Sequence, residues 1–287
     1  MAIWEELSRK QRTESIWICD PQRCSRIKKM KTLKFVYRMS LRFTEPVWDH
    51  YFALRCIPGN DENQKITITS RYVQPTDSLD EVTDGFGNHK YVGHYADLHR
   101  KFEYEVEGIA QVEGMRIRKE ELHPMYRYPS EFTQCGPQIQ AYADRMSNLE
   151  GTNLERAIQV MHQLYEHFQY KSGVTDIHTT AEEAMRLGQG VCQDYAHIMI
   201  AVLRRMGIPA RYVNGLMIGE GYTHAWVEIY TGEGWYGLDP TNNLHVDDYY
   251  IKIAHGRDYK DCVLDKGRFL GMTEQTQEIY VNVEEMK

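Results

Sequence analysis

The spacing of apolar residues changes near the middle of this chain, and that change restricts its fold class more than any other feature. From Phe102 the stretch FEYEVEGIAQVE alternates apolar and polar residues, a pattern that predicts a strand with one buried face. The later stretch NLERAIQVMHQLYEHFQY repeats its apolar residues at helical spacing. The sequence therefore predicts an α+β protein with a β-rich first part and helices in its second part.

Local signals suggest where the parts begin and end. MKTLKFVYRMSLRF from Met30 and KITITSRYV read as strands, and DGFGNHKYV reads as a glycine-containing turn that leads into another strand. Residues 114–150 hold several Pro and Gly residues and mark a connection. With 287 residues, the chain is long enough for two domains. We divide it into an extension (1–30), a β-rich domain (31–120), a linker with an entry helix (121–150) and a core (151–287).

Charge and hydropathy argue against some classes of partner. The net charge is −7, so no basic field favours nucleic acid or an anionic membrane. Residues 1–30 hold seven Lys and Arg against four Asp and Glu, which is +3 and leaves −10 for the rest. No stretch approaches the roughly 20 apolar residues of a membrane span, and the first residues do not resemble a signal peptide. We expect a cytoplasmic protein that binds neither nucleic acid nor membrane; its oligomeric state is open.

The cysteines suggest thiols and not a disulfide framework. Six cysteines are scattered along the chain, with no CxxC pair. Cys19 and Cys24 could bind a metal in principle, but no second pair with zinc spacing accompanies them. We predict no metal and no cofactor.

One cysteine occupies an unusual position. In GQGVCQDYAHIMIAVLRRMG, residues 188–207, Gly188 ends a short helix that a Thr180/Glu183 capping box begins, and a second helix runs from Gly190 to Met206. Cys192 falls in the first turn of that helix, where free backbone N–H groups and the helix dipole favour a thiolate. The alternative is a small apolar residue on a core-facing side of the helix, where free Cys is common.

A hairpin downstream offers partners for this thiol. YTHAWVEIYTGEGWYGLDPTN reads as two strands around a Thr-Gly-Glu-Gly turn. A two-residue turn at 231–232 would place His224 opposite Asp239, whereas a four-residue turn over 231–234 would leave them one diagonal step apart. Either register keeps both residues on one face. Cys192, His224 and Asp239 would then supply a nucleophile, a base and an orienting acid.

Five blocks in this order resemble the bacterial transglutaminase-like cysteine protease family: GQGVCQDYAH, GIPARYVNG, THAWVEIY, GWYGLDPTNN and IAHGRDYKD. The β-rich part resembles the N-terminal domain of many bacterial members, including its DGFGN turn. The resemblance implies a papain-like, transglutaminase-like core in which a nucleophile helix packs on an antiparallel sheet. It also implies catalytic roles for Cys192 as nucleophile, His224 as general acid/base and Asp239 as the group that orients His224. GRDYKDCVL departs from the family pattern GRDY-x-DV-x-P, away from these three residues.

The implied reaction is acyl transfer at a peptide or protein amide through a thioester, with hydrolysis as the expected outcome. Two rival functions are a protein-glutamine acyltransferase and a peptide-binding scaffold without turnover. The oxyanion would meet the Cys192 N–H and one further donor, for which Gln189 and Tyr170 are both candidates.

Four neighbouring features have plainer explanations. Asp194 is expected to stabilise the helix dipole, and His197 to be structural. Trp226 and Trp235 share the face of His224 and Asp239, where they either pack the core or shield the site. Arg257 is expected to tether the C-terminal strand.

Overall fold

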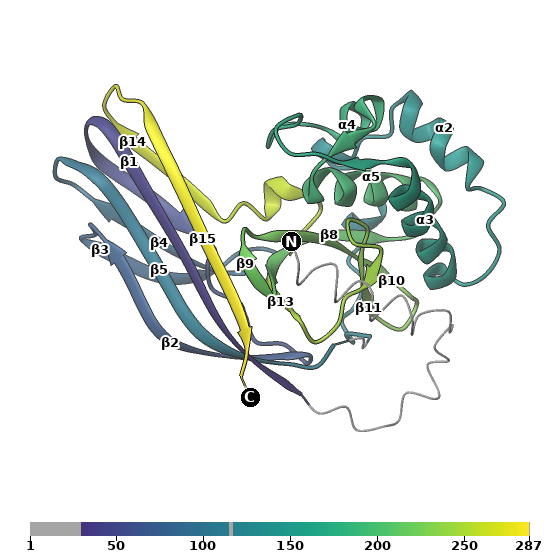
Figure 1. The fold of residues 1–287 in the computed structure, drawn as a ribbon, viewed down its shortest axis with the longest axis horizontal. Helices are drawn as coiled ribbons and strands as arrows, with labels where there is room; N and C mark the ends of the chain where they lie inside the picture. The colour runs from purple at the N-terminus through teal and green to yellow at the C-terminus, as the bar shows by residue number, and fades with distance from the viewer. Residues whose placement is uncertain (1–29, 115–116, 287) are drawn as a thin grey trace.

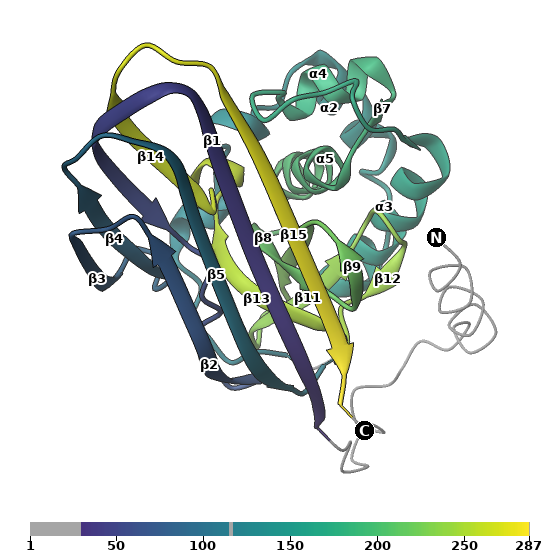
Figure 2. The same ribbon diagram turned by 60° about the vertical axis from the view of Figure 1, so that its left-hand side comes forward.

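Two antiparallel sheets and a group of helices make up the fold, which a computed structural model describes for residues 30–114 and 117–286 (Figure 1). The long strands of the first sheet stand on one side, and the helices lie on the other (Figures 1 and 2). The second sheet lies between them. The predicted α+β class is confirmed. The predicted extension (1–30) falls, except for Met30, outside the described residues, as do Cys19 and Cys24.

The first sheet is built around one long strand. In β1 (Lys31–Leu54), Leu33, Phe35, Tyr37 and Met39 are buried and alternate with more exposed residues, as a sheet with one covered face requires. The predicted strands and the turn before β4 are found. They form β2 (Gln64–Gln74), β3 (Ser78–Thr83), β4 (His89–Tyr95) and β5 (His99–Val112). The sheet order is β2-β5-β1-β15-β9, and β4 and β14 pair with the second half of β1.

The C-terminal strands belong to this first sheet. β15 (Gln275–Glu285) pairs with β1 from Leu33 to Phe43, and β14 (Asp265–Leu270) pairs with β1 near its end. Figure 1 shows the yellow β15 alongside the purple β1. The predicted division assigned residues 151–287 to the core. In the structure, the strands within 265–285 instead belong to the first sheet. The alternation of EIYVNVEE identifies a strand but does not identify its neighbour, which only the folded chain selects.

The helices cover one face of the second sheet. Capping boxes begin α3 (Asn153–His167) at Thr152 and α4 (Ala181–Leu187) at Thr180, and Gly188 ends α4 with φ +68°. The predicted α4 cap and stop are confirmed. The other helical segments are η2 (Pro124–Arg127), η3 (Glu131–Thr133), α2 (Pro137–Arg145), α5 (Cys192–Arg205) and η4 (Tyr259–Asp261). Helix α5 is central and almost wholly buried, which suits its apolar composition from Ile198 to Leu203.

The second sheet has the order β12-β11-β10-β8-β13. Its strands are β8 (Ala210–Met217), β10 (His224–Tyr230), β11 (Trp235–Asp239), β12 (Leu244–His245) and β13 (Tyr250–Gly256). The short strand β9 (Gly219–Gly221) leaves this sheet and pairs with β15 of the first sheet. The segment just before His224 is therefore anchored to the first sheet. A parallel pair, β6 (Gln169–Tyr170) and β7 (Gln189–Gly190), precedes α5.

Two side-chain amides from the first sheet's side bind the outer edge of β13. Gln64 donates to the carbonyl of Lys252 and accepts from its N–H, at 2.8 and 2.9 Å. Asn88, the last residue of the DGFGN turn, does the same with His255, at 2.9 Å for both bonds. Because β13 is the last strand of its sheet, these amides satisfy backbone groups that would otherwise be unpaired. We call Gln64 and Asn88 the amide clamp.

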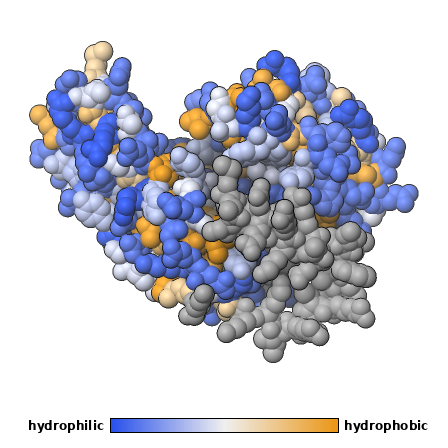
Figure 3. Space-filling model, viewed as in Figure 1, coloured by the Kyte–Doolittle hydropathy of each residue, from blue (hydrophilic) through white to orange (hydrophobic). Residues whose placement is uncertain are grey.

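The surface seen in Figure 3 is mostly hydrophilic, and it is hollowed between the tips of the first sheet and the helices. Among the described residues, no helix is long and apolar enough to cross a membrane.

Candidate active site

The start of α5 places Cys192 at the first helical position. The N-cap is Val191, in extended conformation, so the backbone N–H groups of the first turn are directed out of the helix end. The parallel pair β6–β7 leads the chain into this position through Gly190, which is buried. A Cβ on Gly190 would lie 2.4 Å from an Asp194 carboxylate oxygen, so only glycine fits. The predicted helix is found with Cys192 in its first turn, although it begins at Cys192 and not at Gly190, which belongs to β7.

Asp194 fixes this helix start. Its Oδ2 accepts hydrogen bonds from the Val191 N–H and from the Thr175 hydroxyl, both at 2.7 Å. Burial raises the pKa of Asp194, against the lowering effect of these two bonds. Asp194 therefore pairs the backbone N–H of the N-cap residue and ties the segment around Thr175 to the helix. This is more than the dipole role expected from the sequence.

The hairpin register decides how His224 and Asp239 meet. Tyr230 pairs with Trp235 and Val227 with Leu238, so residues 231–234 form the four-residue turn and His224 lies one diagonal step from Asp239. His224 Nε2 is 2.8 Å from Asp239 Oδ2, and both side chains are buried. Of the two registers left open by the sequence, the structure adopts the longer turn.

Cys192 completes the line of side chains. The Cys192 side chain lies near enough to the His224 ring to raise its pKa through hydrogen bonding and charge. Since Asp239 occupies Nε2, Nδ1 is left for the thiol. Burial works against a charge on His224, but the Asp239 carboxylate and both hydrogen bonds outweigh it and raise the pKa of His224. The three predicted residues are therefore brought together in the order Cys192, His224, Asp239.

Asp239 has more partners than the sequence suggested. Its Oδ2 also accepts from Asn242 Nδ2 at 2.8 Å and from the Tyr250 hydroxyl at 2.9 Å, and its Oδ1 accepts from the N–H groups of Thr241 and Asn242. Burial tends to raise the pKa of Asp239, but the charge of His224 and these donors lower it. Sequence reasoning missed Asn242 and Tyr250. The Asp-Pro-Thr-Asn run could have indicated Asn242 as a turn partner of Asp239, whereas no local signal indicates Tyr250.

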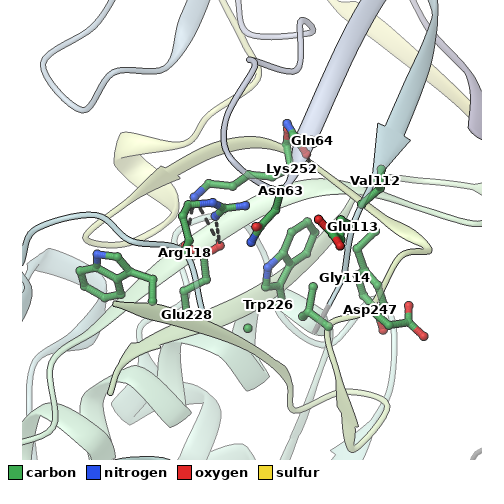
Figure 4. Close-up of a pocket in the computed structure, with 14 residues that line it drawn as sticks. Asn63, Gln64, Val112, Glu113, Gly114, Arg118, Trp226, Glu228, Asp247 and Lys252 are labelled. Carbon is green, nitrogen blue, oxygen red and sulfur yellow. Dashed lines mark hydrogen bonds and ion pairs between the residues drawn. The ribbon is translucent and has the colours of Figure 1, made fainter. Parts of the chain in front are cut away.

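A second cluster of charges lies behind this site on the same sheet face. Glu228, two residues beyond Trp226, binds Arg118 at 2.6 Å, Arg211 at 2.7 Å and Lys252 at 3.0 Å. Figure 4 shows Glu228 with Arg118 and Lys252 beside Trp226. Burial alone would raise the pKa of Glu228, but the three cations lower it well below its usual range. Residues of both sheets line a cavity of about 40 Å³ here, including Gln64, Trp226 and Tyr250. That is room for a few water molecules.

Comparison with known proteins supports the interpretation of these elements. Residues 140–240, which contain Cys192, His224 and Asp239, match the transglutaminase-like superfamily. Residues 33–111 match the bacterial transglutaminase-like N-terminal region. The chain therefore holds a transglutaminase-like core preceded by a bacterial transglutaminase-like N-terminal region.

Individual relatives cover the chain to different extents. An uncharacterised Mycobacterium leprae protein is 39% identical over 124 residues, which is 40% of this chain and 44% of that one. An uncharacterised Mycobacterium tuberculosis protein is 29% identical over 264 residues, covering 79% and 84% of the two chains. The protein-glutamine gamma-glutamyltransferase of Pseudomonas aeruginosa is 42% identical over only 65 residues, 18% of this chain and 10% of that one.

A crystal structure from Cytophaga hutchinsonii, provisionally described as a cysteine protease, superimposes with a TM-score of 0.75. It covers 91% of this chain and 92% of its own, at 21% identity, and so shows the shared fold. The predicted transglutaminase-like core behind a bacterial N-terminal region is confirmed.

The two tryptophans of this transglutaminase-like core have different surroundings. Trp226 lies against His224, with ring centroids 6.4 Å apart, and against Tyr250 at 5.5 Å. Trp235 instead stacks on Arg211 at 4.2 Å and contacts Tyr126 and Tyr230. Only Trp226 flanks the candidate site. Trp235 pairs with the far end of β10, at Tyr230, so sharing a strand face with Asp239 does not bring it to the site.

His197 and Arg257 have structural contacts. His197 is fully buried and its Nε2 accepts the Tyr259 N–H at 3.1 Å, and burial lowers its pKa to about 3. The Arg257 side chain binds Asp261 at 2.8 Å, and its carbonyl accepts a hydrogen bond from Arg204 of α5 at 2.8 Å. Arg257 therefore fastens its loop to α5, which differs from the tether to the C-terminal strand that the sequence suggested.

The second oxyanion donor remains a choice between Gln189 and Tyr170. Tyr170 is exposed, and its pKa is raised first by partial burial and then by the charge of Cys192, which places it near the thiol. Gln189 lies on β7, three residues before Cys192. Within residues 30–114 and 117–286, no group of three or more His, Cys, Asp or Glu side chains is arranged to hold a metal ion.

Proposed function

We propose that the protein catalyses cysteine-dependent acyl transfer at a peptide or protein amide, with water as the usual acceptor. It would act as a peptidase or amidase in the cytoplasm. The observation that carries this proposal is the series of neighbouring side chains Cys192, His224 and Asp239, in which Cys192 lies at the start of a buried helix. A nucleophile, a base within hydrogen-bond reach and an orienting acid are the parts that thioester chemistry needs.

The steps follow from the positions of these groups. The Cys192 sulfur, as a thiolate, attacks the amide carbonyl, and the C–S bond forms as the carbonyl oxygen becomes an oxyanion. The backbone N–H of Cys192, at the first helical position, would donate to that oxygen, and Gln189 or Tyr170 would supply the second donor. The His224 imidazolium then gives its proton to the leaving amine as the C–N bond breaks.

Water resolves the thioester in the second half of the reaction. His224, now neutral, takes a proton from the water as its oxygen bonds to the acyl carbon, and the thiolate leaves. Asp239 stays ionised throughout, because its hydrogen bonds hold the carboxylate and keep the ring in one orientation.

Transfer to an amine is the second candidate function. The Pseudomonas aeruginosa protein-glutamine gamma-glutamyltransferase shares 42% identity with a 65-residue part of this chain. An amine can replace water only where a site binds the amine and holds water off the thioester, since well-oriented groups reach effective molarities of about 10⁵ M. A peptide-binding scaffold without turnover is the third candidate, and a complete Cys–His–Asp set disfavours it.

One incubation distinguishes these functions. A set of peptide and isopeptide amides is incubated with the protein, with and without millimolar primary amine or hydroxylamine, and the products are identified by mass spectrometry. Free acid as the main product supports hydrolysis. A dominant adduct at low amine concentration would make the protein a transferase.

Thiol labelling tests the scaffold alternative without a known substrate. Cys56 and Cys262 are buried, and burial raises the pKa of both thiols well above the ordinary value. Burial also raises the pKa of Cys135. Iodoacetamide at mildly acidic pH should therefore modify Cys192 first in the described part of the chain, and a Cys192→Ser variant should lose that fast phase. Equal labelling of Cys135 and Cys192 would contradict the proposed nucleophile.

A further inference from the structure

The Tyr250 hydroxyl binds the same carboxylate oxygen as His224. It lies 2.9 Å from Asp239 Oδ2, which His224 Nε2 approaches to 2.8 Å. Tyr250 is buried, and burial, together with the charges of Asp239 and Asp247, raises the pKa of its phenol well above the ordinary value. The hydroxyl therefore keeps its proton and can only donate to the carboxylate.

We propose that Tyr250 is a positioning residue for the proposed acyl-transfer reaction, because its hydroxyl holds the Asp239 carboxylate on His224 and disperses part of the carboxylate charge. The inference rests on the proposed function for its effect on turnover. Its effect on the His224 ring does not depend on any substrate.

The fold gives Tyr250 a fixed place from which to act. It is the first residue of β13, and two residues later the Gln64 amide binds both backbone groups of Lys252. Its ring packs edge-on against Trp226, which in turn lies beside His224. Tyr250 also lines the cavity between the sheets, together with Lys252 and Glu228, which form an ion pair there (Figure 4). A phenol held on a strand with these contacts has little freedom to leave Asp239.

The hydroxyl should set how tightly Asp239 holds the imidazolium. A carboxylate oxygen that already accepts from Tyr250 and Asn242 carries less negative charge toward His224. The ring then remains acidic enough to protonate the leaving amine. The titratable groups around this oxygen are His224 on β10, Cys192 at the start of α5, and Tyr250 itself on β13, with Asp247 acting on Tyr250 through its charge.

Two replacements at position 250 should shift the titration midpoint of His224 in opposite directions. Tyr250→Phe removes the donor and leaves no unpaired polar atom on the new side chain. The His224 titration midpoint, followed by NMR of ¹⁵N-histidine-labelled full-length protein, should rise by about one pH unit. The kcat on an amide substrate should fall about tenfold with KM little changed, since an imidazolium held more tightly is a weaker acid. Site-specific 3-fluorotyrosine, a stronger donor of nearly the same shape, should lower the midpoint instead.

Tyr249→Phe is the matched control. In the wild type, the Tyr249 hydroxyl also donates to a carboxylate, Glu285 Oε2 at 3.2 Å, but this bond is exposed. It should change neither the His224 midpoint nor kcat.

Each outcome has a separate meaning. An unchanged His224 midpoint in folded Tyr250→Phe, or equal shifts from the two Tyr→Phe variants, overturns the positioning role. If the wild type turns over no amide but the position-250 variants still shift His224 in opposite directions, the proposed function fails and the positioning of Asp239 by Tyr250 stands. If 3-fluorotyrosine and Phe at position 250 shift the His224 titration midpoint in the same direction, altered packing causes the shift and the inference is wrong.

Discussion

At the scale of single residues, Asp239 shows how a fully buried carboxylate can stay ionised. An unpaired buried carboxylate takes up a proton, because losing its hydration disfavours the charge. Here five hydrogen bonds reach its two oxygens, from His224, Thr241, Tyr250 and twice from Asn242. Those donors lower the pKa of Asp239 in spite of its burial. The charge of Asp239 in turn raises the pKa of His224.

Replacing this carboxylate should cost activity more than stability. We expect Asp239→Asn to lower kcat by as much as about 10⁴, because the amide no longer stabilises the imidazolium or fixes the ring orientation. The variant should still fold, since Asn has the same shape and can accept from the same backbone groups. Turnover of an amide substrate and circular dichroism are the two measurements. A variant that keeps the wild-type rate would show that Asp239 does not orient His224.

The His224–Asp239 pair should also make stability depend on pH. The folded pKa of His224 is raised to about 10 from an ordinary value of 6.5. The pair therefore stabilises the fold fully below about pH 6.5, and this contribution is lost as pH rises toward the folded pKa. In urea unfolding, the advantage of wild type over His224→Gln should shrink between pH 6.5 and 9, by on the order of 1 kcal/mol per pH unit. A difference in unfolding free energy that is constant with pH would argue against a charged ring.

At the scale of elements, β13 connects the two sheets. One of its edges pairs with β8, and the amide clamp of Gln64 and Asn88 binds Lys252 and His255 on the other. Side-chain amides present a donor and an acceptor together, so each can replace one residue of a neighbouring strand. The DGFGN turn can thus be explained physically. Asp84 accepts from the N–H of Phe86 and Asn88 and shapes the turn that presents Asn88.

Removing one arm of the clamp should destabilise the protein. Gln64→Ala leaves the N–H and carbonyl of Lys252 unpaired in a buried place, which costs about 2 kcal/mol. Gln111→Ala, at an exposed position on β5, is the control and should stay within about 0.5 kcal/mol of wild type. Urea unfolding of both variants gives the comparison. Equal unfolding free energies for Gln64→Ala and Gln111→Ala would mean that water replaces the Gln64 amide with no loss of stability.

At the scale of the whole molecule, the two sheets are joined by a strand connection, by ion pairs and by one apolar core. Strand β9 leaves β8 to pair with β15, and β15 pairs with β1 at the other end of the sequence. Arg118 reaches Glu228 of the second sheet and Asp61 near the start of β2. One apolar cluster includes Phe35 of β1 and Ile198 of α5. Separate unfolding of either sheet would leave buried charges without partners, which is costly.

The sheets should therefore unfold together. In native-state hydrogen exchange, the most protected amides of β1 and β5 should show the same opening free energy as those of α5 and β10. Fragments from all four elements can be read in one mass-spectrometry experiment. Opening free energies that differ by several kcal/mol between the two groups would show that the sheets are independent domains.

The sequence alone predicted several of the elements and the three residues of the candidate site. Alternation in residues 31–43 and 102–113, the capping residues Thr180 and Gly188, and the helix that begins at Cys192 depend on neighbours a few residues away, so local pattern predicts them. The hairpin around 231–234 put His224 and Asp239 on one face in either register, because strand side chains alternate with period two. Local pattern therefore singles out Cys192, His224 and Asp239 among the many polar residues of the chain.

Tertiary structure decided which distant groups complete these elements. Tyr250 meets Asp239 only because β13 lies across β8 from β10, and Trp235 is directed to Arg211 and not to the site because its partner on β10 is Tyr230. Strands β14 and β15 pair with β1, and β15 also pairs with β9 through residues 281–283, a choice between sheet edges that strand pattern does not encode. Gln64 and Asn88 look like ordinary polar residues of turns and strands until β13 presents its unpaired edge to them. The Gln64 and Asn88 contacts join residues more than a hundred positions apart, and their energy depends on burial that exists only once the chain has folded.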